Sequence, residues 1–588
     1  MHFPGVIAAS TLVGAVLGAG LDDVLLGQQN VLGPSSKPAS TKKPNIIFVL
    51  TDDQDLHMDS LDYMPHLKEH LIDKGTLFKR HFCTTAICCP ARVSLWTGML
   101  AHNTNVTDVN PPYGGYPKFL SQGLNENYLP VWLQDAGYNT YYTGKLFNAH
   151  TVDNYNSPHA AGWTQSDFVL DPYTYDYLNA SYQRNHDPPI SYEGQNTMDV
   201  LTTKAYGMLD DAVKGDKPFF LGLAPVAPHS NVRRRNDEEF NHPGSISGFI
   251  FSPPIPAQRH EHLFEDAQVP RKPNFNPDQP SGANWVRERE QLTRENVEFN
   301  DYFYRQRLRA LQSVDELVEG VFEKLEEYGL LDNTYVFYTT DNGYHISQHR
   351  LQPGKECSFE EDINIPLVIR GPGVPEGEVS QIVTTHTDLA PTILSLVGAP
   401  LRASFDGEPV PLTKDGLEGA IKTRSEHVTV EYWGIAAFEG AIEFTPDRLI
   451  VNNTYKAVRV ISEQYNLLYS TDPYQMHNLL HPDEAAFAPS RLLGVPISKV
   501  IDRLDSLLFV LKSCKGHTCV RPWQALHPNG NVQTLKDALS PRFDAFYTYQ
   551  TRVEYDHCEM GYIPEAEGAQ FEKDGYVYRQ GTPWHEWV

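Results

Sequence analysis

The residues that most clearly indicate a chemical reaction are Cys88-Cys89-Pro90-Ala91-Arg92. A proline lies two residues and an arginine four residues after the first cysteine. Proline is favoured at the first helical position because its missing N–H would be unpaired there. Pro90 therefore predicts a helix start, with Cys88 just outside the helix. A helix N-terminus attracts anions through its free N–H groups, and Arg92 adds a fixed cation. Taken alone, the pattern leaves a disulfide or metal site involving Cys83 open.

Other polar residues follow stretches that read as buried strands. Strands are predicted from the apolar stretches 46–50, 138–143, 218–224, 334–339 and 366–370. Helices are predicted at 64–74, 128–136 and 297–328. This alternation predicts a parallel α/β sheet, in which ligands bind beyond the carboxyl ends of the strands. Any one polar cluster there is compatible with a turn or a helix cap, but together they favour a site made of Asp52, Asp53, Lys145, His229, Asp341 and Asn342.

The residue types at this edge indicate a metal and an anion. Carboxylate and amide oxygens suit Ca²⁺ or Mg²⁺ better than zinc, which prefers histidine and cysteine. The oxygen donors are Asp52, Asp53, Asp341 and Asn342. A metal ion with several cationic donors stabilises charge on a transferring group such as a sulfate ester. Such donors are offered by Arg92, Lys145, His229 and Lys355.

The ordered motifs resemble type I sulfatases of the alkaline-phosphatase-like superfamily and are similar to fungal arylsulfatases and N-acetylglucosamine-6-sulfatases. Besides the Cys88 motif, the matching stretches are 49–55, 142–145, 225–229, 270–276, 340–345, 388–392 and 469–473, and the resemblance covers most of residues 44–480. It implies an α/β fold with a large, mostly parallel sheet flanked by helices. A smaller C-terminal α+β antiparallel subdomain is expected beside it.

The resemblance also implies a mechanism. A formylglycine-generating enzyme would oxidise Cys88 to formylglycine (3-oxoalanine), whose hydrate attacks sulfur and later re-forms the carbonyl. The modified Cys88 would share one Ca²⁺ ion with the four oxygen donors named above. Arg92 and Asp341 would favour the alkoxide of the hydrate, His229 would act as general acid, and Lys355 would assist the leaving group. Lys145 would be a further positive donor to the anion.

One position departs from the family pattern. Many sulfatases have a histidine two residues after the equivalent of Lys145, where it helps the elimination step. Phe147 stands at that position here. Asn148, His150 and His345 remain open as substitutes, and Phe147 is expected to wall the pocket.

Four segments are expected: a signal peptide at 1–20, a linker at 21–43, a catalytic domain at 44–430 and a C-terminal subdomain with tail at 431–588. The apolar part of the signal is too short to span a bilayer. Sequons at Asn105, Asn179 and Asn452 agree with a glycoprotein in the endomembrane lumen or outside the cell. No membrane span is expected.

Charge and cysteine content narrow the function classes. The chain has 48 Lys and Arg against 74 Asp and Glu, a net charge of −26, which argues against nucleic-acid binding. Its seven cysteines leave one unpaired or modified, and Cys514 with Cys519 can close a short disulfide loop. The Pro-rich stretch 231–289 is expected to be an irregular surface excursion bordering the cleft.

Two alternatives remain at this point. A phosphatase or phosphodiesterase on the same fold usually has Ser or Thr in place of Cys88 and two zinc ions with more histidine ligands. A non-catalytic carbohydrate-binding relative would be expected to lack a metal ligand or the nucleophile. The substrate, an aryl sulfate or a sulfated sugar, is not determined by the sequence.

Overall fold

The structure, a computed structural model, describes residues 42–571 apart from 237–238, 240–241, 243–244, 441, 443–448, 462–471, 473, 478–490 and 556. The predicted signal peptide and nearly all of the linker therefore lie outside the described residues. So does most of the motif at 469–473. Among the residues described, no helix is long and apolar enough to cross a lipid bilayer.

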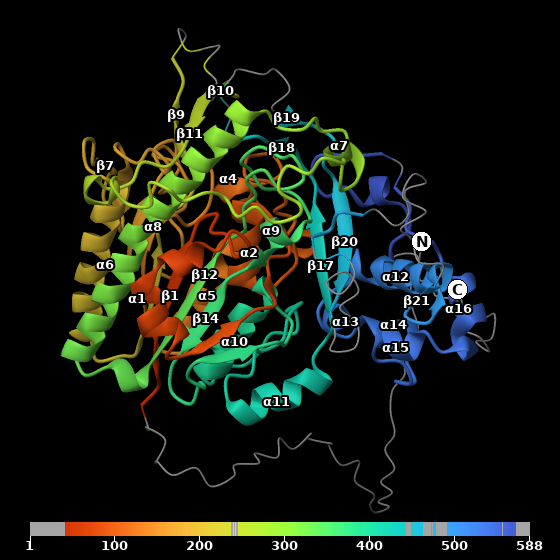
Figure 1. Cartoon of the computed structure of the whole chain (residues 1–588). Coiled ribbons are helices and arrows are strands. Elements are labelled where there is room, and N and C mark those ends of the chain that lie inside the picture. The colour runs from red at the N-terminus through yellow and green to blue at the C-terminus, as the bar shows by residue number, and fades with distance from the viewer. Residues whose placement is uncertain are drawn as a thin grey trace, which may run out of the picture. The chain divides into compact units, whose positions relative to one another are not determined.

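A 10-stranded sheet forms the centre of the fold (Figure 1), in the order β15-β2-β14-β12-β1-β8-β4-β5-β6-β7. Its central strands β12, β1, β8, β4 and β5 run parallel to one another. Their bounds are Thr334–Thr340, Asn45–Thr51, Phe219–Ala224, Asn139–Gly144 and Gln165–Val169. The sequence prediction of a mostly parallel sheet is confirmed.

Antiparallel pairs occur toward both edges of this sheet. β14 pairs antiparallel with β12 and with β2, and β6 pairs antiparallel with β5 and β7. The outer strands are β2 Thr76–Phe78, β14 Leu367–Arg370, β15 Glu378–Ser380, β6 Ser181–Arg184 and β7 Ile190–Ser191. The strand predicted at 366–370 is therefore present, but it runs against its neighbours.

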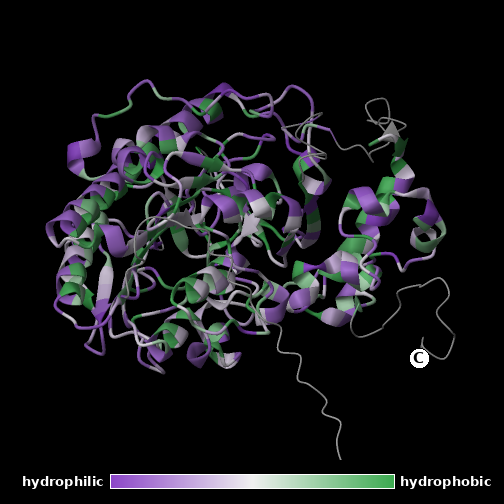
Figure 2. Ribbon diagram, turned by 90° about the horizontal axis from the view of Figure 1, so that it is seen from below, coloured by the Kyte–Doolittle hydropathy of each residue, from purple (hydrophilic) through white to green (hydrophobic). Residues whose placement is uncertain are grey.

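Strand β1 separates two hydrophobic cores because successive side chains of a strand point to opposite faces. Phe48 lies in one core, with side chains from helices α2, α4, α5, α10 and α11. Val49 lies in the other, with side chains from α1, α6 and α8. These helices span Cys88–Thr97, Gly115–Ser121, Leu129–Asp135, Leu389–Leu396, Lys414–Thr423, Pro65–Leu67, Thr197–Val213 and Arg294–Glu327. Figure 2 shows hydrophobic residues gathered inside and hydrophilic ones over the outer helices and loops.

The long helix α8 shows how the sequence sets its ends. The Thr293 side chain caps the first turn by accepting a hydrogen bond from the backbone N–H of Asn296. Beyond the last turn, Gly329 adopts a φ of +62°, a conformation that glycine reaches without strain and that commonly ends helices. The helix predicted at 64–74 is also present, as α1 followed by the π-helix η2 at Lys68–Ile72.

The region expected to be irregular, 231–289, has more structure than predicted. It contains the small antiparallel sheet β10-β11-β9, with strands Ser245–Ile246, Phe249–Ser252 and Asn231–Arg234, and the short helices η5 Gln258–His260 and α7 Asn284–Arg287. The prolines do not break these strands because they lie outside them. The prediction of an irregular excursion is therefore wrong for this part.

The C-terminal part combines antiparallel strand pairs with short helices. The strand pairs are β17–β20, β18–β19 and β21–β22, with bounds His427–Tyr432, Tyr455–Val460, Ala436–Ala437, Leu449–Ile450, Arg491–Leu492 and Val495–Pro496. The helices are α12 Ile497–Leu511, α13 His517–Val520, α14 Pro522–Leu526, α15 Leu535–Ala538 and α16 Asp544–Thr548. Cys514 and Cys519 form a disulfide, as the sequence suggested. The α+β antiparallel character expected here is confirmed.

Candidate active site

The polar residues predicted to follow the strands meet at one edge of the central sheet. Asp52 follows β1, Lys145 follows β4 and Asp341 follows β12, each at the first position beyond the strand. Because these strands are parallel, their carboxyl ends lie together. His229 belongs to the turn beyond β8, where its N–H donates to the carbonyl of Val226 at 2.9 Å.

Helix α2 enters this edge with Cys88 in its first turn. The helix spans Cys88–Thr97 with Ile87 as its N-cap, so it begins two residues earlier than the sequence predicted. Pro90 still fits, because the first four N–H groups of a helix have no intrahelical partner. Cys88 is 2% exposed and Arg92 0%, and at four residues apart they share one helix face.

Arg92 connects three strand ends. Its Nε donates to Asp341 Oδ2 at 2.8 Å, its Nη2 to Asp52 Oδ2 at 3.1 Å, and its Nη1 to the Lys145 carbonyl at 2.5 Å. Lys145 Nζ also donates to Asp52 Oδ2, at 2.5 Å. Cys88 Sγ donates to the other Asp52 oxygen at 3.5 Å. Two cations and two carboxylates therefore surround the cysteine.

A second charged group forms around Asp53. Lys355 Nζ donates to both Asp53 oxygens, at 2.7 and 2.6 Å, and His229 Nε2 lies 3.6 Å from Asp53 Oδ2. His229 Nδ1 lies 2.8 Å from the carbonyl of Ser230. That carbonyl can only accept, so Nδ1 carries the proton and Nε2 faces the site.

The donor set suits a hard cation. Asn342 Oδ1 is buried and has no hydrogen-bond partner among the described residues, while its Nδ2 donates to Asp53 Oδ1 at 2.7 Å. Donor atoms of Asp52, Asp53, Cys88 and His229 lie within 4.8 Å of one another. An unpaired amide oxygen beside buried carboxylates matches the oxygen ligands of Ca²⁺. These residues therefore fit the implied ion.

The buried charges set the protonation of the site. Burial opposes the charge of Arg92, but Asp341 and Asp52 raise its pKa above the ordinary value. Burial would likewise raise the pKa of Asp341, yet Arg92 and Lys145 hold it well below its usual range. Burial, with Asp52, raises the pKa of the Cys88 thiol well above its ordinary value. A neutral thiol is a poor nucleophile, so the unmodified cysteine is not activated.

Phe147 does not resemble a pocket wall. It is 1% exposed and packs in the aromatic core, 4.6 Å between ring centroids from Phe119. His150 is fully buried beside Tyr116, at 4.2 Å between centroids, and burial lowers its pKa to about 3. His345 Nδ1 is hydrogen-bonded to Asp362 at 2.8 Å.

Asn148 is linked to the charged groups through Tyr175, a residue that the sequence did not indicate. Asn148 Nδ2 donates to the Tyr175 hydroxyl at 2.8 Å. The half-buried Tyr175 ring stacks on His229, with centroids 3.9 Å apart, and lies 4.9 Å from Lys145 Nζ. Glu439, beside Lys355, was also missed. Neither residue follows a predicted strand of the sheet or belongs to a recognised motif, so no sequence signal pointed to them.

Comparison with known proteins defines the class. The family model described as Sulfatase matches residues 44–399, which is more than half of the chain. The chain therefore belongs to the sulfatase family and is a sulfuric ester hydrolase. Its fold is that of the alkaline-phosphatase-like sulfatases.

The chain is similar to both arylsulfatases and N-acetylglucosamine-6-sulfatases. An arylsulfatase of Volvox carteri is 38% identical over 555 residues, covering 88% of this chain and 82% of that protein. The N-acetylglucosamine-6-sulfatase of Homo sapiens is 30% identical over 544 residues, covering 85% and 90%. The solved structure of BT4656 with its substrate D-glucosamine-2-N,6-O-disulfate has a TM-score of 0.57 and 21% identity, covering 76% of this chain and 95% of that one.

Proposed function

We propose that this protein hydrolyses aryl or sugar sulfate esters with a formylglycine made from Cys88 and one Ca²⁺ ion. The observation that supports this most strongly is the enclosure of Cys88 by buried cations and carboxylates from separate strand ends. Arg92 and Lys145 bind Asp52 beside Cys88, and all of these side chains are fully buried. The family assignment favours this activity over the phosphatase and the non-catalytic alternatives.

The ion would be held by Asp52, Asp53, Asp341, Asn342 and the modified Cys88. When bound, it would supply Lewis-acid stabilisation of charge on the sulfate oxygens. The formylglycine hydrate would supply the oxygen nucleophile. Binding of the sulfate and transfer of a proton to the leaving alcohol are assigned to basic side chains.

Arg92 and Lys145 fix the anion. Both are fully buried and cannot leave their positions without leaving Asp52 uncompensated, so they present preorganised positive charge to the sulfate. His229 holds its ring by the bond to the Ser230 carbonyl and by stacking on Tyr175. Because Nδ1 keeps its proton in that bond, the proton given to the departing alcohol must be a second one, carried on Nε2 by the imidazolium form of His229, while Lys355 donates a hydrogen bond there.

Secretion and maturation are part of the proposal. Sequence pattern supports the signal peptide at 1–20, the segment bounds 44–430 and 431–588, and glycosylation at the sequons. The resemblance supports the action of a formylglycine-generating enzyme. The substrates named for relatives, aryl sulfates and 6-sulfated glucosamine, are the classes to test.

The test is production in a host with the converting enzyme, followed by mass spectrometry of the peptide that contains Cys88. We expect an aldehyde at position 88 and turnover of 4-nitrocatechol sulfate. Cys88→Ala should abolish turnover with little change in Tm. Cys89→Ala is the matched control and should retain the activity, because Cys89 packs in the hydrophobic core. Full turnover by protein whose Cys88 is an intact thiol would refute the mechanism.

A further inference from the structure

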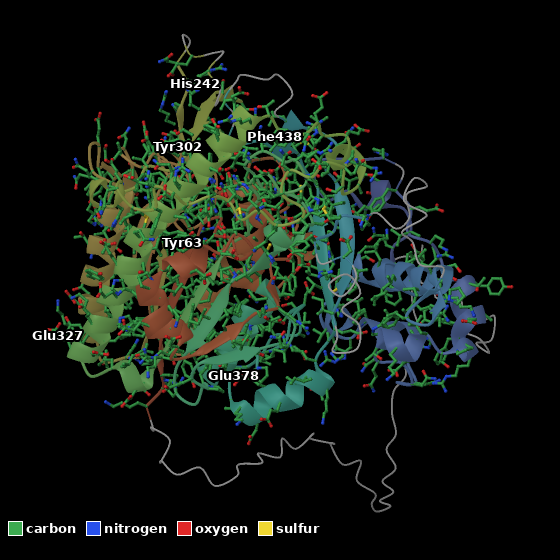
Figure 3. All side chains as sticks on the ribbon, in the orientation of Figure 1. Tyr63, His242, Tyr302, Glu327, Glu378 and Phe438 are labelled. Carbon is green, nitrogen blue, oxygen red and sulfur yellow. A yellow bond between two sulfur atoms is a disulfide. The ribbon has the colours of Figure 1, made fainter. Side chains whose placement is uncertain are left out.

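A buried carboxylate from the C-terminal part of the chain reaches the candidate active site. Glu439 is 3% exposed and lies beyond residues 44–399, which match the family model. Its Oε1 is 3.2 Å from Lys355 Nζ. The preceding residue, Phe438, is labelled in Figure 3, on the same upper side of the molecule as β18 and β19 in Figure 1.

Backbone contacts hold Glu439 in register with the Lys355 segment. The Glu439 N–H donates to the Pro353 carbonyl at 2.8 Å, and the Ala437 N–H donates to Glu356 Oε2 at 3.0 Å. On the other side, the Glu356 N–H donates to the carbonyl of Ala86 at 3.1 Å, just before helix α2. These hydrogen bonds tie residues 437–439 to the segment that carries Lys355.

The second oxygen of Glu439 is fully engaged. Oε2 accepts from the Ser230 hydroxyl at 2.6 Å and from the Tyr344 hydroxyl at 2.9 Å. Ser230 is also the residue whose carbonyl orients His229. The contacts of Glu439 therefore lead to the two groups proposed to assist the leaving alcohol, directly to Lys355 and through Ser230 to His229.

We propose that Glu439 is a positioning residue that holds Lys355 in place for the departing oxygen. This inference rests on the proposed function. Lys355 otherwise relies on Asp53, which is itself assigned to the metal. Glu439, unlike Asp53, is not assigned to the proposed Ca²⁺ site. It therefore holds the Lys355 ammonium in place while Asp53 binds the Ca²⁺.

The mechanism makes a prediction about leaving groups. If Glu439 acts through Lys355, its loss matters most when the departing alcohol is a poor leaving group. Glu439→Gln keeps the size and the hydrogen-bonding oxygen but removes the charge. We expect kcat/KM to fall roughly 10-fold for 4-nitrophenyl sulfate and roughly 100-fold for phenyl sulfate, in the range of proton-transfer effects.

A neighbouring carboxyl provides the matched control. Glu356 is assigned no role in metal binding and is buried next to Lys355 in the sequence; burial raises the pKa of its carboxyl well above the ordinary value. Its Oε2 accepts a hydrogen bond from the Ala437 N–H, which the amide oxygen of a glutamine can also accept. Glu356→Gln should therefore leave kcat/KM and its leaving-group dependence unchanged. An equal fold-loss on both substrates in Glu439→Gln, or no loss, would overturn the proposal.

A double-mutant cycle covers the case in which Glu439→Gln folds poorly. Lys355→Met removes the partner, and Lys355→Met/Glu439→Gln removes both charges, so that Glu439 is not left as a buried ion without its lysine. We expect the second substitution to change kcat/KM less than twofold in the Lys355→Met background, because coupled residues are non-additive. A further loss of 10-fold there would contradict the proposal. An inactive wild-type protein with formylglycine at position 88 would instead count against the proposed function.

Discussion

Arg92→Lys tests whether the geometry of one guanidinium, rather than its charge, organises the site. Arg92 makes three hydrogen bonds to groups at the ends of three strands. A lysine ammonium keeps the charge but cannot present donors in a planar fork. The variant is therefore expected to keep one of the three bonds.

The magnitude follows from the bonds lost. Hydrogen bonds that involve a charged group contribute about 1.5–3 kcal/mol each, so losing two costs about 3–6 kcal/mol. For a chain of this size we expect Tm to fall by about 2–5 °C. Under the proposed function Arg92 binds the sulfate, so its displacement should lower kcat/KM by about 100-fold.

Arg503 provides a matched control in helix α12. It is also 0% exposed and donates to the Ala538 carbonyl at 3.1 Å, the Lys499 carbonyl at 3.3 Å and Asp544 Oδ1 at 2.6 Å. Arg503→Lys should lower Tm by a comparable amount and leave kcat/KM unchanged. Both variants are compared by thermal unfolding at fixed Ca²⁺ and by aryl sulfate turnover. Wild-type kcat/KM in Arg92→Lys, or an equal activity loss in both variants, would refute the reasoning.

Three further predictions concern the metal and pH. Removal of divalent ions by EGTA should lower Tm and stop turnover, and Ca²⁺ but not Zn²⁺ should restore both; recovery with Zn²⁺ would exclude the oxygen-ligand set. Asp341→Asn should remove about 2–3 kcal/mol of Ca²⁺-linked stabilisation. The control Asp315→Asn weakens the hydrogen bonds to the first turn of α1 and should lower Tm equally with and without Ca²⁺. If Ca²⁺ raised Tm by the same amount in both variants, Asp341 would not be a ligand. Burial raises the pKa of Glu426 to about 7, so between the unfolded pKa and pH 7 the native state binds a proton that the unfolded state has lost. The free energy of unfolding therefore falls by about 3 kcal/mol as pH rises through this range. Glu426→Gln should unfold at a higher temperature than wild type at pH 8 and at a similar temperature near pH 4.5; a difference in Tm that stays constant across this range would show the sign to be wrong.

The sequence predicted the central strands β1, β4, β8 and β12 because their signal is local, whereas β5 was not predicted. Apolar runs that end in Asp52 and Asp341 mark both a buried strand and the edge where it stops. The start of α2 was less accurate, since Pro90 is tolerated at more than one position of a first turn. The direction of β14 was not predictable, because its pairing depends on the path of the chain between β12 and β14.

Residues brought in by tertiary packing could not be found this way. Tyr175 reaches the site only because its ring stacks on His229, and Glu439 only because its backbone N–H donates to the Pro353 carbonyl, two residues before Lys355. Phe147 shows the opposite error. Its position in the family pattern suggested a wall of the pocket, but a large apolar side chain gains more by packing against Phe119.

The enclosure of Cys88 has a consequence for how the protein is made. With 2% of its surface accessible, the sulfur cannot be reached by another enzyme once β1, β4 and β12 have closed around it. Under the proposed chemistry, oxidation of Cys88 must therefore precede folding of this part of the chain. The fraction of active protein then depends on the rate of modification relative to the rate of folding. Molecules that close first are permanently inert, and adding the modifying enzyme to the finished protein would rescue them only after denaturation.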